Sequence, residues 1–111
     1  MLIRKPVAVV MMALISIAGN VWAAGDAERG QDLIADCIEC HGQDGMGSFE
    51  TPQIAGLTEA YIVKQLKEFH SGKRESLDGI MNLYTSERSA QDLEDLAAYW
   101  ATVKPTIADS E

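Results

Sequence analysis

The sequence of 111 residues contains only two cysteines and two histidines, so few residues are available to bind a metal or to form a disulfide. It also lacks any segment in which apolar and polar residues alternate, as they do along a half-buried β-strand. No internal repeat and no low-complexity tract is present. These absences argue against a sheet or a repeat array, and the expected fold is all-α.

Basic residues are scarce, because nine lysines and arginines stand against seventeen aspartates and glutamates. Two of the nine, Arg4 and Lys5, lie in the first 23 residues, which contain no acidic residue, so the remaining chain has a net charge of −10 with histidine neutral. Such an acidic surface repels nucleic acid and anionic lipid. We therefore expect protein partners with basic docking patches, no nucleic acid, and no membrane for the mature chain.

The first 23 residues have the order of a secretory signal peptide. A basic start precedes the uncharged run Val7–Ala18, and Val21 and Ala23 occupy the two positions that a signal peptidase reads. The apolar run is shorter than the roughly 20 residues of a membrane span, although an uncleaved anchor remains the alternative. We predict cleavage near Ala23 and a periplasmic location. Residues 24–111 then form one small domain, which a covalent cross-link or a bound metal would stabilise.

Three helices are predicted in this domain. The first spans 26–36, where apolar residues share one face and charged residues the other. The second begins at Thr58, a good N-cap, and ends near Gly72, a residue typical of helix C-termini. The third begins at Ser89, whose spacing to Asp92 is that of a capping box, and ends before the last proline.

Gly30 lies in the middle of the apolar face of the first predicted helix, where glycine costs about 1 kcal/mol relative to alanine. We interpret it as a point of close approach by another helix. Segments 42–56 and 73–88 show no helical period and are predicted as loops. Loops of this length in a compact domain usually serve a functional site.

Both cysteines lie in the sequence Cys37-Ile38-Glu39-Cys40-His41. Two thiols on one turn, followed directly by histidine, form the attachment motif of c-type haem. The thiols add to two vinyl groups of one haem edge, and the imidazole of His41 is then placed under the iron as an axial ligand. The motif predicts one covalent haem c held by Cys37 and Cys40, with Ile38 and Glu39 near its exposed edge.

Three other uses of two nearby cysteines agree less well with the sequence. A thioredoxin-like redox pair requires alternating strands and helices around the motif. A zinc site needs a fourth ligand, which only His70 could supply. A disulfide across two intervening residues would be strained and easily reduced.

The second axial ligand decides between an electron carrier and a haem protein with an open site. The predicted mature chain has two methionines, Met46 and Met81. Met46 follows His41 by five residues, too few to reach the opposite face of a ring that His41 already holds. Met81 follows by forty residues and is predicted as the axial ligand, whereas His70 is expected on the surface at a helix end.

With these residues in place, the chain resembles the class I cytochromes c, in particular their small soluble periplasmic branch with one haem. The resemblance rests on the haem motif with its glycine-rich turn at 42–45, on Pro52-Gln53-Ile54-Ala55-Gly56, on the segment 61–74, and on Leu96-Ala97-Ala98-Tyr99-Trp100. It implies three main helices packed around the haem, with the N- and C-terminal helices crossing at Gly30. It also implies that the carbonyl of Pro52 holds the second nitrogen of His41.

The resemblance implies an electron carrier rather than an enzyme, in which haem ligated by His41 and Met81 passes single electrons in transient complexes. Two alternatives stay open: a haem subunit docked on a flavin or molybdenum dehydrogenase, and a ligand-binding haem protein with an open sixth site. The chain departs from the family over 82–88, which is more polar than usual, with Arg88 where an apolar residue is common.

Overall fold

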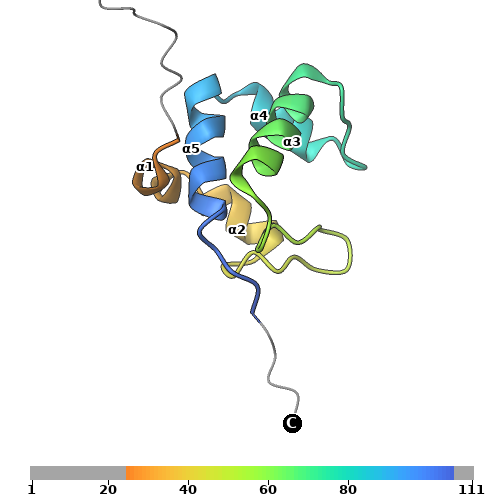
Figure 1. Cartoon of the computed structure of the whole chain (residues 1–111). Helices are drawn as coiled ribbons and strands as arrows, with labels where there is room; N and C mark the ends of the chain where they lie inside the picture. The colour runs from red at the N-terminus through yellow and green to blue at the C-terminus, as the bar shows by residue number, and fades with distance from the viewer. Residues whose placement is uncertain (1–24, 107–111) are drawn as a thin grey trace, which may run out of the picture.

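The computed structural model describes residues 25–106 as five helices joined by loops (Figure 1). The helices are α1 (Ala27–Asp32), α2 (Ala35–His41), α3 (Glu59–Ser71), α4 (Ile80–Ser86) and α5 (Ala90–Trp100). Residues 25–106 contain no β-strand, so the predicted all-α class is confirmed. Within that range no helix is long and apolar enough to cross a bilayer. The predicted signal peptide, residues 1–23, lies outside the described residues.

A short turn divides the first predicted helix in two. Asp26 caps α1 by accepting hydrogen bonds from two backbone N–H groups of the first turn. α1 ends at Asp32, and the turn consists of its C-cap Leu33 and of Ile34, the N-cap of α2. Because both turn residues keep right-handed helical dihedral angles, the apolar period continues through the break and does not reveal it. The prediction of one helix over 26–36 is therefore wrong, and the cysteine motif lies on a helix of its own.

The ends of α3 and the start of α5 agree with the predictions from their terminal residues. Thr58 accepts a hydrogen bond from the N–H of Tyr61 at 3.2 Å, and Gly72 ends α3 in the left-handed conformation with a φ of 81°. Ser89 and Asp92 form a reciprocal capping box at the start of α5. Local sequence signals are sufficient to define these boundaries.

The predicted loop over 73–88 contains the helix α4, and the prediction is wrong there. Gly79 precedes α4 with a φ of 74° and provides no side-chain cap. Two apolar residues of α4, Ile80 and Leu83, lie on the protein surface, so this short helix shows no inward-facing apolar period. Hydrogen bonds to α3 and to the segment between the two helices fix α4 instead. The pattern of apolar residues in the sequence does not reveal such hydrogen bonds.

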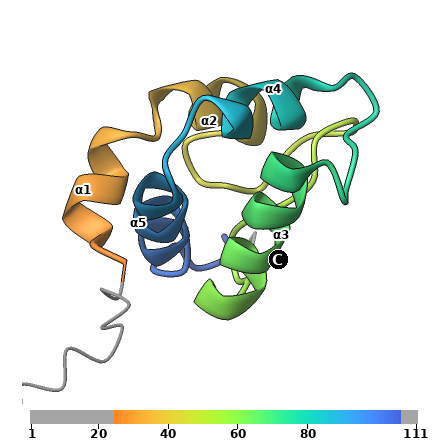
Figure 2. The ribbon, with the colours of Figure 1, turned by 90° about the horizontal axis from the view of Figure 1, so that it is seen from above.

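α1 and α5 cross at a contact that only glycine permits (Figure 2). Gly30 is buried, and a Cβ atom on it would overlap the backbone carbonyl of Asp95 and lie 2.9 Å from the Cβ of Tyr99. The predicted close approach at Gly30 and the predicted crossing of the terminal helices are both confirmed. The contact holds the middle of α1 against the middle of α5.

Asp95 is completely buried at this crossing and binds three donors. Its carboxylate accepts hydrogen bonds from the backbone N–H of Asp26 at 2.8 Å, from Arg29 at 2.5 Å and from the side chain of Gln91 at 2.8 Å. Burial alone would raise the pKa of Asp95, but these donors outweigh burial and hold the pKa below its usual value. An ionised carboxylate thus links α1 to α5.

The hydrophobic core is small and lies around α5. Its centre consists of Ile62, Ala97 and Trp100, and Cys37 and Ile38 of α2 pack against it with part of their surface still open. α5 lies between α1 and α3 (Figures 1 and 2). Because α2 contributes to this core, the position of the cysteine motif is set by the packing of the whole domain.

Replacing Gly30 by valine should lower the free energy of unfolding by about 1–3 kcal/mol or more, because the added carbons overlap the Asp95 carbonyl. The measurement is the thermal unfolding midpoint of the haem-containing protein. Gln31→Val, on the exposed side of α1, is the matched control and should cost only the small difference in helix propensity. Equal midpoints for the two variants would place the helix crossing elsewhere.

Replacing Asp95 by asparagine should lower the free energy of unfolding at neutral pH by about 1–3 kcal/mol, because a buried charged acceptor is lost. A carboxylate with a lowered pKa stabilises the fold above its unfolded pKa of about 3.9, and this contribution is lost as the pH falls through the native pKa. The difference between parent and variant should therefore shrink below about pH 4. Denaturant titrations from pH 3 to 7 measure this difference in the free energy of unfolding. Asp32→Asn, at an exposed position, is the control. A difference that does not change with pH would contradict the role of charge.

Candidate functional site

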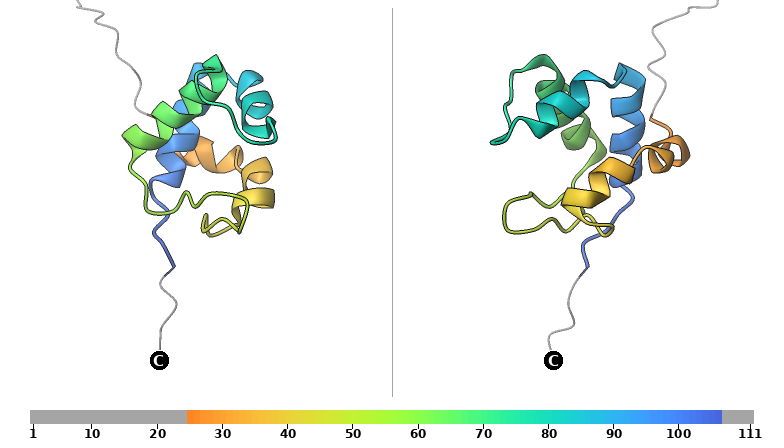
Figure 3. Two further views of the ribbon diagram at one scale, coloured as in Figure 1. Left: turned by 90° about the vertical axis from the view of Figure 1, so that its right-hand side faces the viewer. Right: turned by 180° about the vertical axis from the view of Figure 1, so that it is seen from behind.

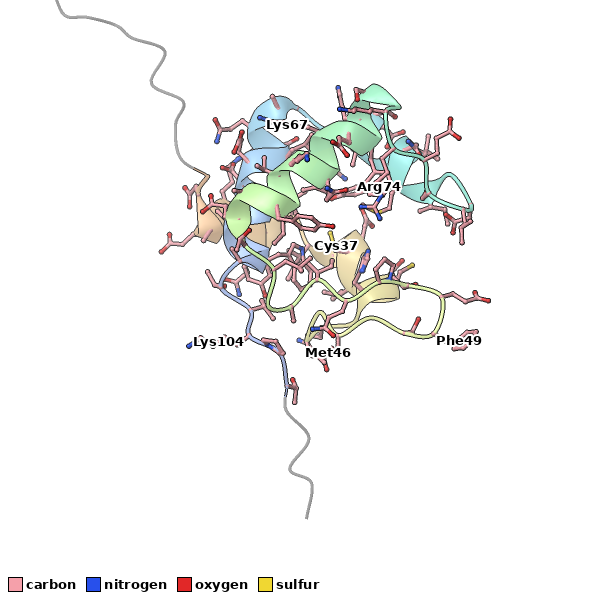
Figure 4. The ribbon with its side chains drawn as sticks, turned by 45° about the vertical axis from the view of Figure 1, so that its right-hand side comes forward. Cys37, Met46, Phe49, Lys67, Arg74 and Lys104 are labelled. Atoms are coloured by element: carbon pink, nitrogen blue, oxygen red, sulfur yellow. The ribbon has the colours of Figure 1, made fainter. Side chains whose placement is uncertain are left out.

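Two cysteines and a histidine lie together on α2, from its third residue to its last. Both cysteines are free thiols, with Cys37 half-buried and Cys40 exposed. Residues three and four positions apart share a helix face, so Cys40 and His41 both lie beside Cys37. Figure 4 shows Cys37 on α2, beneath α3. The helix thus presents two thiols and an imidazole close to one another.

His41 is buried, and its Nδ1 lies 2.8 Å from the carbonyl oxygen of Pro52. A carbonyl can only accept, so Nδ1 of the neutral imidazole carries the hydrogen and donates it. The other nitrogen, Nε2, is then unprotonated and has a lone pair available for a metal. This hydrogen bond fixes both the tautomer of His41 and the direction of its ring.

The glycine-rich loop 42–56 folds back on α2 and brings Pro52 to His41. The N–H of Gly47 donates to the carbonyl of His41 at 2.8 Å. The carbonyl of Gly45 accepts from the N–H groups of Ile54 and Ala55 at 2.8 and 2.9 Å. Gly45 also lies against the ring of Trp100, where a Cβ atom would come within 2.8 Å of the ring. The loop is therefore anchored on both α2 and α5.

The surroundings of Cys37 are apolar. Burial raises the pKa of its thiol, although the nearby Trp100 and Tyr84 side chains act in the opposite direction. Burial likewise raises the pKa of the Tyr84 hydroxyl, which donates to the carbonyl of Leu33 at 3.4 Å. Trp100 is buried, and its Nε1–H has no acceptor of normal hydrogen-bond geometry within residues 25–106. A low-dielectric surface, with the indole N–H of Trp100 near it, thus lies beside the first thiol.

Met81 lies in the first turn of α4 and is half-buried. Its backbone N–H donates to Oγ of Ser76 at 3.2 Å, and its carbonyl accepts from Oγ1 of Thr85 at 2.7 Å. Thr85 is completely buried, and its own carbonyl lies 2.7 Å from Nδ1 of His70 on α3. Hydrogen bonds from both sides therefore fix the backbone of Met81.

Asn82, the residue after Met81, connects α4 to the end of α3. Its side-chain nitrogen donates to the carbonyls of Phe69 and Arg74 at 3.0 and 2.7 Å, and its Oδ1 accepts from the N–H of Ser76 at 2.9 Å. Sequence reasoning missed Asn82 as a residue that shapes the site. The available signal was the polar stretch after Met81, whose side chains turn out to make these hydrogen bonds.

His70 is exposed, as the sequence predicted, and it bonds to Thr85 on α4 rather than lying beside the cysteines. Met46 is also engaged elsewhere, since its sulfur accepts a hydrogen bond from the N–H of Thr106 at 3.4 Å. Figure 4 shows Met46 low on the molecule, below α2. The segments that carry the two methionines, α4 and loop 42–56, lie on different sides of α2 (Figure 3).

The side chains around α2 fit a covalently attached haem. Two thiols, an imidazole with a free Nε2 and a methionine on a separate element are groups that can attach haem c and ligate its iron. Large apolar side chains on α3 and α4, namely Tyr61, Ile80 and Leu83, are 49–64% exposed and could cover its apolar faces. Within residues 25–106, no three His, Cys, Asp or Glu side chains are arranged so that they could hold a metal ion by themselves, so the zinc alternative has no ligand set there.

Comparison with known proteins gives one consistent result. The family model described as Cytochrome c matches residues 27–104. Cytochrome c4 of Pseudomonas aeruginosa is 38% identical over 98 residues, which cover 87% of this chain and 48% of that protein. The thiosulfate dehydrogenase electron acceptor of Thiomonas intermedia is 36% identical over 106 residues, which cover 93% of this chain and 46% of that protein.

Among solved structures, the reduced recombinant cytochrome c4 of Pseudomonas stutzeri matches with a TM-score of 0.65 and 38% identity, over 76% of this chain and 48% of that one. The chain spans about half the length of the curated relatives that it matches. The fold, the match over 27–104 and the cysteine motif on α2 agree with one another. The chain belongs to the cytochrome c family, whose members bind haem c covalently.

Proposed function

We propose that this protein is an electron carrier with one covalently bound haem c. Cys37 and Cys40 form the two thioethers, Nε2 of His41 is one axial ligand, and the sulfur of Met81 is the other. When bound, the haem supplies a one-electron couple between ferric and ferrous iron. The observation that carries the proposal is the motif on α2 with its imidazole already oriented by Pro52 at 2.8 Å.

The protein's own groups then have separate tasks. The Pro52 carbonyl holds His41 in the tautomer that can bind iron. Ser76 and Thr85 hold the backbone of Met81, and Asn82 ties the next residue to the end of α3, which limits exchange of the ligand with water. The buried indole N–H of Trp100 is available as a donor to a polar group of the cofactor. These residues position and shield a redox centre and provide no group for bond-making chemistry on a substrate, so the proposal is a carrier and not an enzyme.

The proposed location is the periplasm, after removal of a signal peptide near Ala23. The support is the sequence order of residues 1–23, with a basic start, an uncharged run and a small residue at the cleavage position. The cysteines, which attach the cofactor, follow this segment. One cysteine motif in the chain supports one haem.

The proposed partners are redox proteins with an apolar contact surface bordered by basic residues. Phe49 and Leu77 are fully exposed at the tips of two loops, 42–56 and 72–79, which project on the same side of the molecule (Figure 3). Glu50 lies next to Phe49, and Glu75 and Asp78 flank Leu77, all of them exposed. Opposite charges steer such an encounter, whereas the apolar tips fit a partner's apolar patch.

A second candidate is a haem subunit of an oxidoreductase complex. The name of the Thiomonas intermedia relative, thiosulfate dehydrogenase electron acceptor, supports this candidate because it links that relative to one particular dehydrogenase. The two roles share the same haem site and differ in the lifetime of the complex. Gel filtration of a periplasmic extract separates them, since a subunit elutes at the size of its complex.

Haem should remain on the polypeptide when the parent protein is extracted with acidified organic solvent, because thioethers survive this treatment. Cys37→Ala and Cys40→Ala should each leave one thioether, and the double variant should release all of its haem. The measurement is haem absorbance in the two phases. Release of haem from the parent would contradict covalent attachment.

Replacing Met81 by alanine should lower the reduction potential by more than about 59 mV, a factor of ten in the one-electron equilibrium constant. The physical reason is that a neutral, soft thioether favours ferrous over ferric iron. The same variant should bind carbon monoxide and cyanide, whereas the parent binds carbon monoxide poorly. Potentiometric titration and ligand titrations followed by absorbance provide the measurements.

Met46→Ala is the matched control and should change neither property, because the Met46 sulfur contacts Thr106. The ferric parent should also show the weak near-red band of sulfur–iron ligation. A band that survives Met81→Ala and vanishes in Met46→Ala would overturn the ligand assignment. A parent without the band would make the ligand-binding haem protein the better description.

A further inference from the structure

Arg88 lies in the short connection between α4 and α5, and its side chain turns toward α2. Its guanidinium is 4.6 Å from the centre of the Tyr84 ring, and Nη2 is 3.5 Å from Oδ2 of Asp36. Its Nε is buried and has no hydrogen-bond partner within residues 25–106. The positively charged guanidinium of Arg88 is therefore held in a largely covered position, on the side of α2 where Cys37 lies.

The side chains of Arg88 and Asp36 are exposed to water to different extents, so water screens their charges differently. The Arg88 side chain is 26% exposed, whereas that of Asp36 is 63% exposed. Water screens the carboxylate more than the guanidinium, and a separation of 3.5 Å is long for a charged hydrogen bond. The two charges are therefore screened to different extents, and neither fully cancels the other.

The pKa of the Cys37 thiol responds to both charges. Burial is the largest effect on the pKa of the Cys37 thiol and raises it. The charge of Asp36 also raises this pKa, and the charge of Arg88, a smaller effect than that of Asp36, lowers it. Ionising a thiol and reducing a haem attached to it each add one negative charge at this place. A charge that favours the thiolate should therefore also favour reduction of the haem, and a charge that disfavours the thiolate should disfavour reduction.

We propose that Arg88 raises the reduction potential of the haem attached at Cys37, and that Asp36 opposes it. This inference rests on the proposed covalent haem. Reduction adds one electron, supplied by the external reductant, and forms or breaks no bond. A fixed cation stabilises the reduced state more than the oxidised one by the Coulomb energy of that one added charge. Tyr84 acts as the support that keeps the guanidinium in place.

The test is a potentiometric titration of the haem-containing full chain in the parent and in three variants. Arg88→Met keeps the length of the side chain and removes the charge, and it should lower the reduction equilibrium constant by about three- to tenfold, roughly 28 to 59 mV. Arg88→Lys keeps the charge and should stay close to the parent. Asp36→Asn should shift the constant the other way and raise it, because it removes the opposing negative charge.

The opposite signs distinguish electrostatics from damage to the site. Loosened packing would shift Arg88→Met and Asp36→Asn in the same direction, and that result would overturn the proposal. Equal potentials for Arg88→Lys and Arg88→Met, both away from the parent, would also overturn it, because charge would then be irrelevant. The near-red band and the thermal midpoint of each variant show that the haem site is intact. Loss of haem from the parent itself would refute the proposed function instead.

Discussion

The close contact of α1 with α5 is the constraint on which the rest of the structure depends. Because no side chain fits between Gly30 and the carbonyl of Asp95, the two helices have one possible separation. α2 follows α1 after a turn of two residues, so its place in the domain is set by the same contact. Trp100, at the other end of α5, then packs near Cys37 and against Gly45. One crossing thus positions both the cysteine motif and the loop that carries Pro52.

How much of the fold the sequence predicts depends on whether the stabilising interactions are local. The caps at Thr58 and Ser89 connect residues three positions apart, so a sequence pattern contains them. α4 is held by bonds between residues 13 and 15 positions apart, such as Asn82 with Phe69 and Thr85 with His70. Only the path of α3 brings these partners together, and that path is a property of the folded chain.

The same distinction applies to the site. The attachment motif is contained in five adjacent residues, and chemistry alone is sufficient to interpret it. The pairing of His41 with Pro52 spans eleven residues of glycine-rich loop, and only the family resemblance predicted it. The polar stretch after Met81 looked like a departure from the family. In the structure its polarity has a use, because Asn82 and Thr85 replace apolar packing by directed hydrogen bonds.

The charges of this protein act over two different ranges. Exposed acidic residues are screened within about 8 Å at physiological salt, so they govern how partners approach and how strongly salt affects that approach. Arg88 is largely covered, and salt screens it much less. A surface with excess negative charge disfavours the gain of an electron. The charge of Arg88 opposes this effect, because it lies largely covered beside α2, the helix with the cysteine motif. The exposed carboxylates thereby govern mainly association, whereas Arg88 acts mainly on the redox potential.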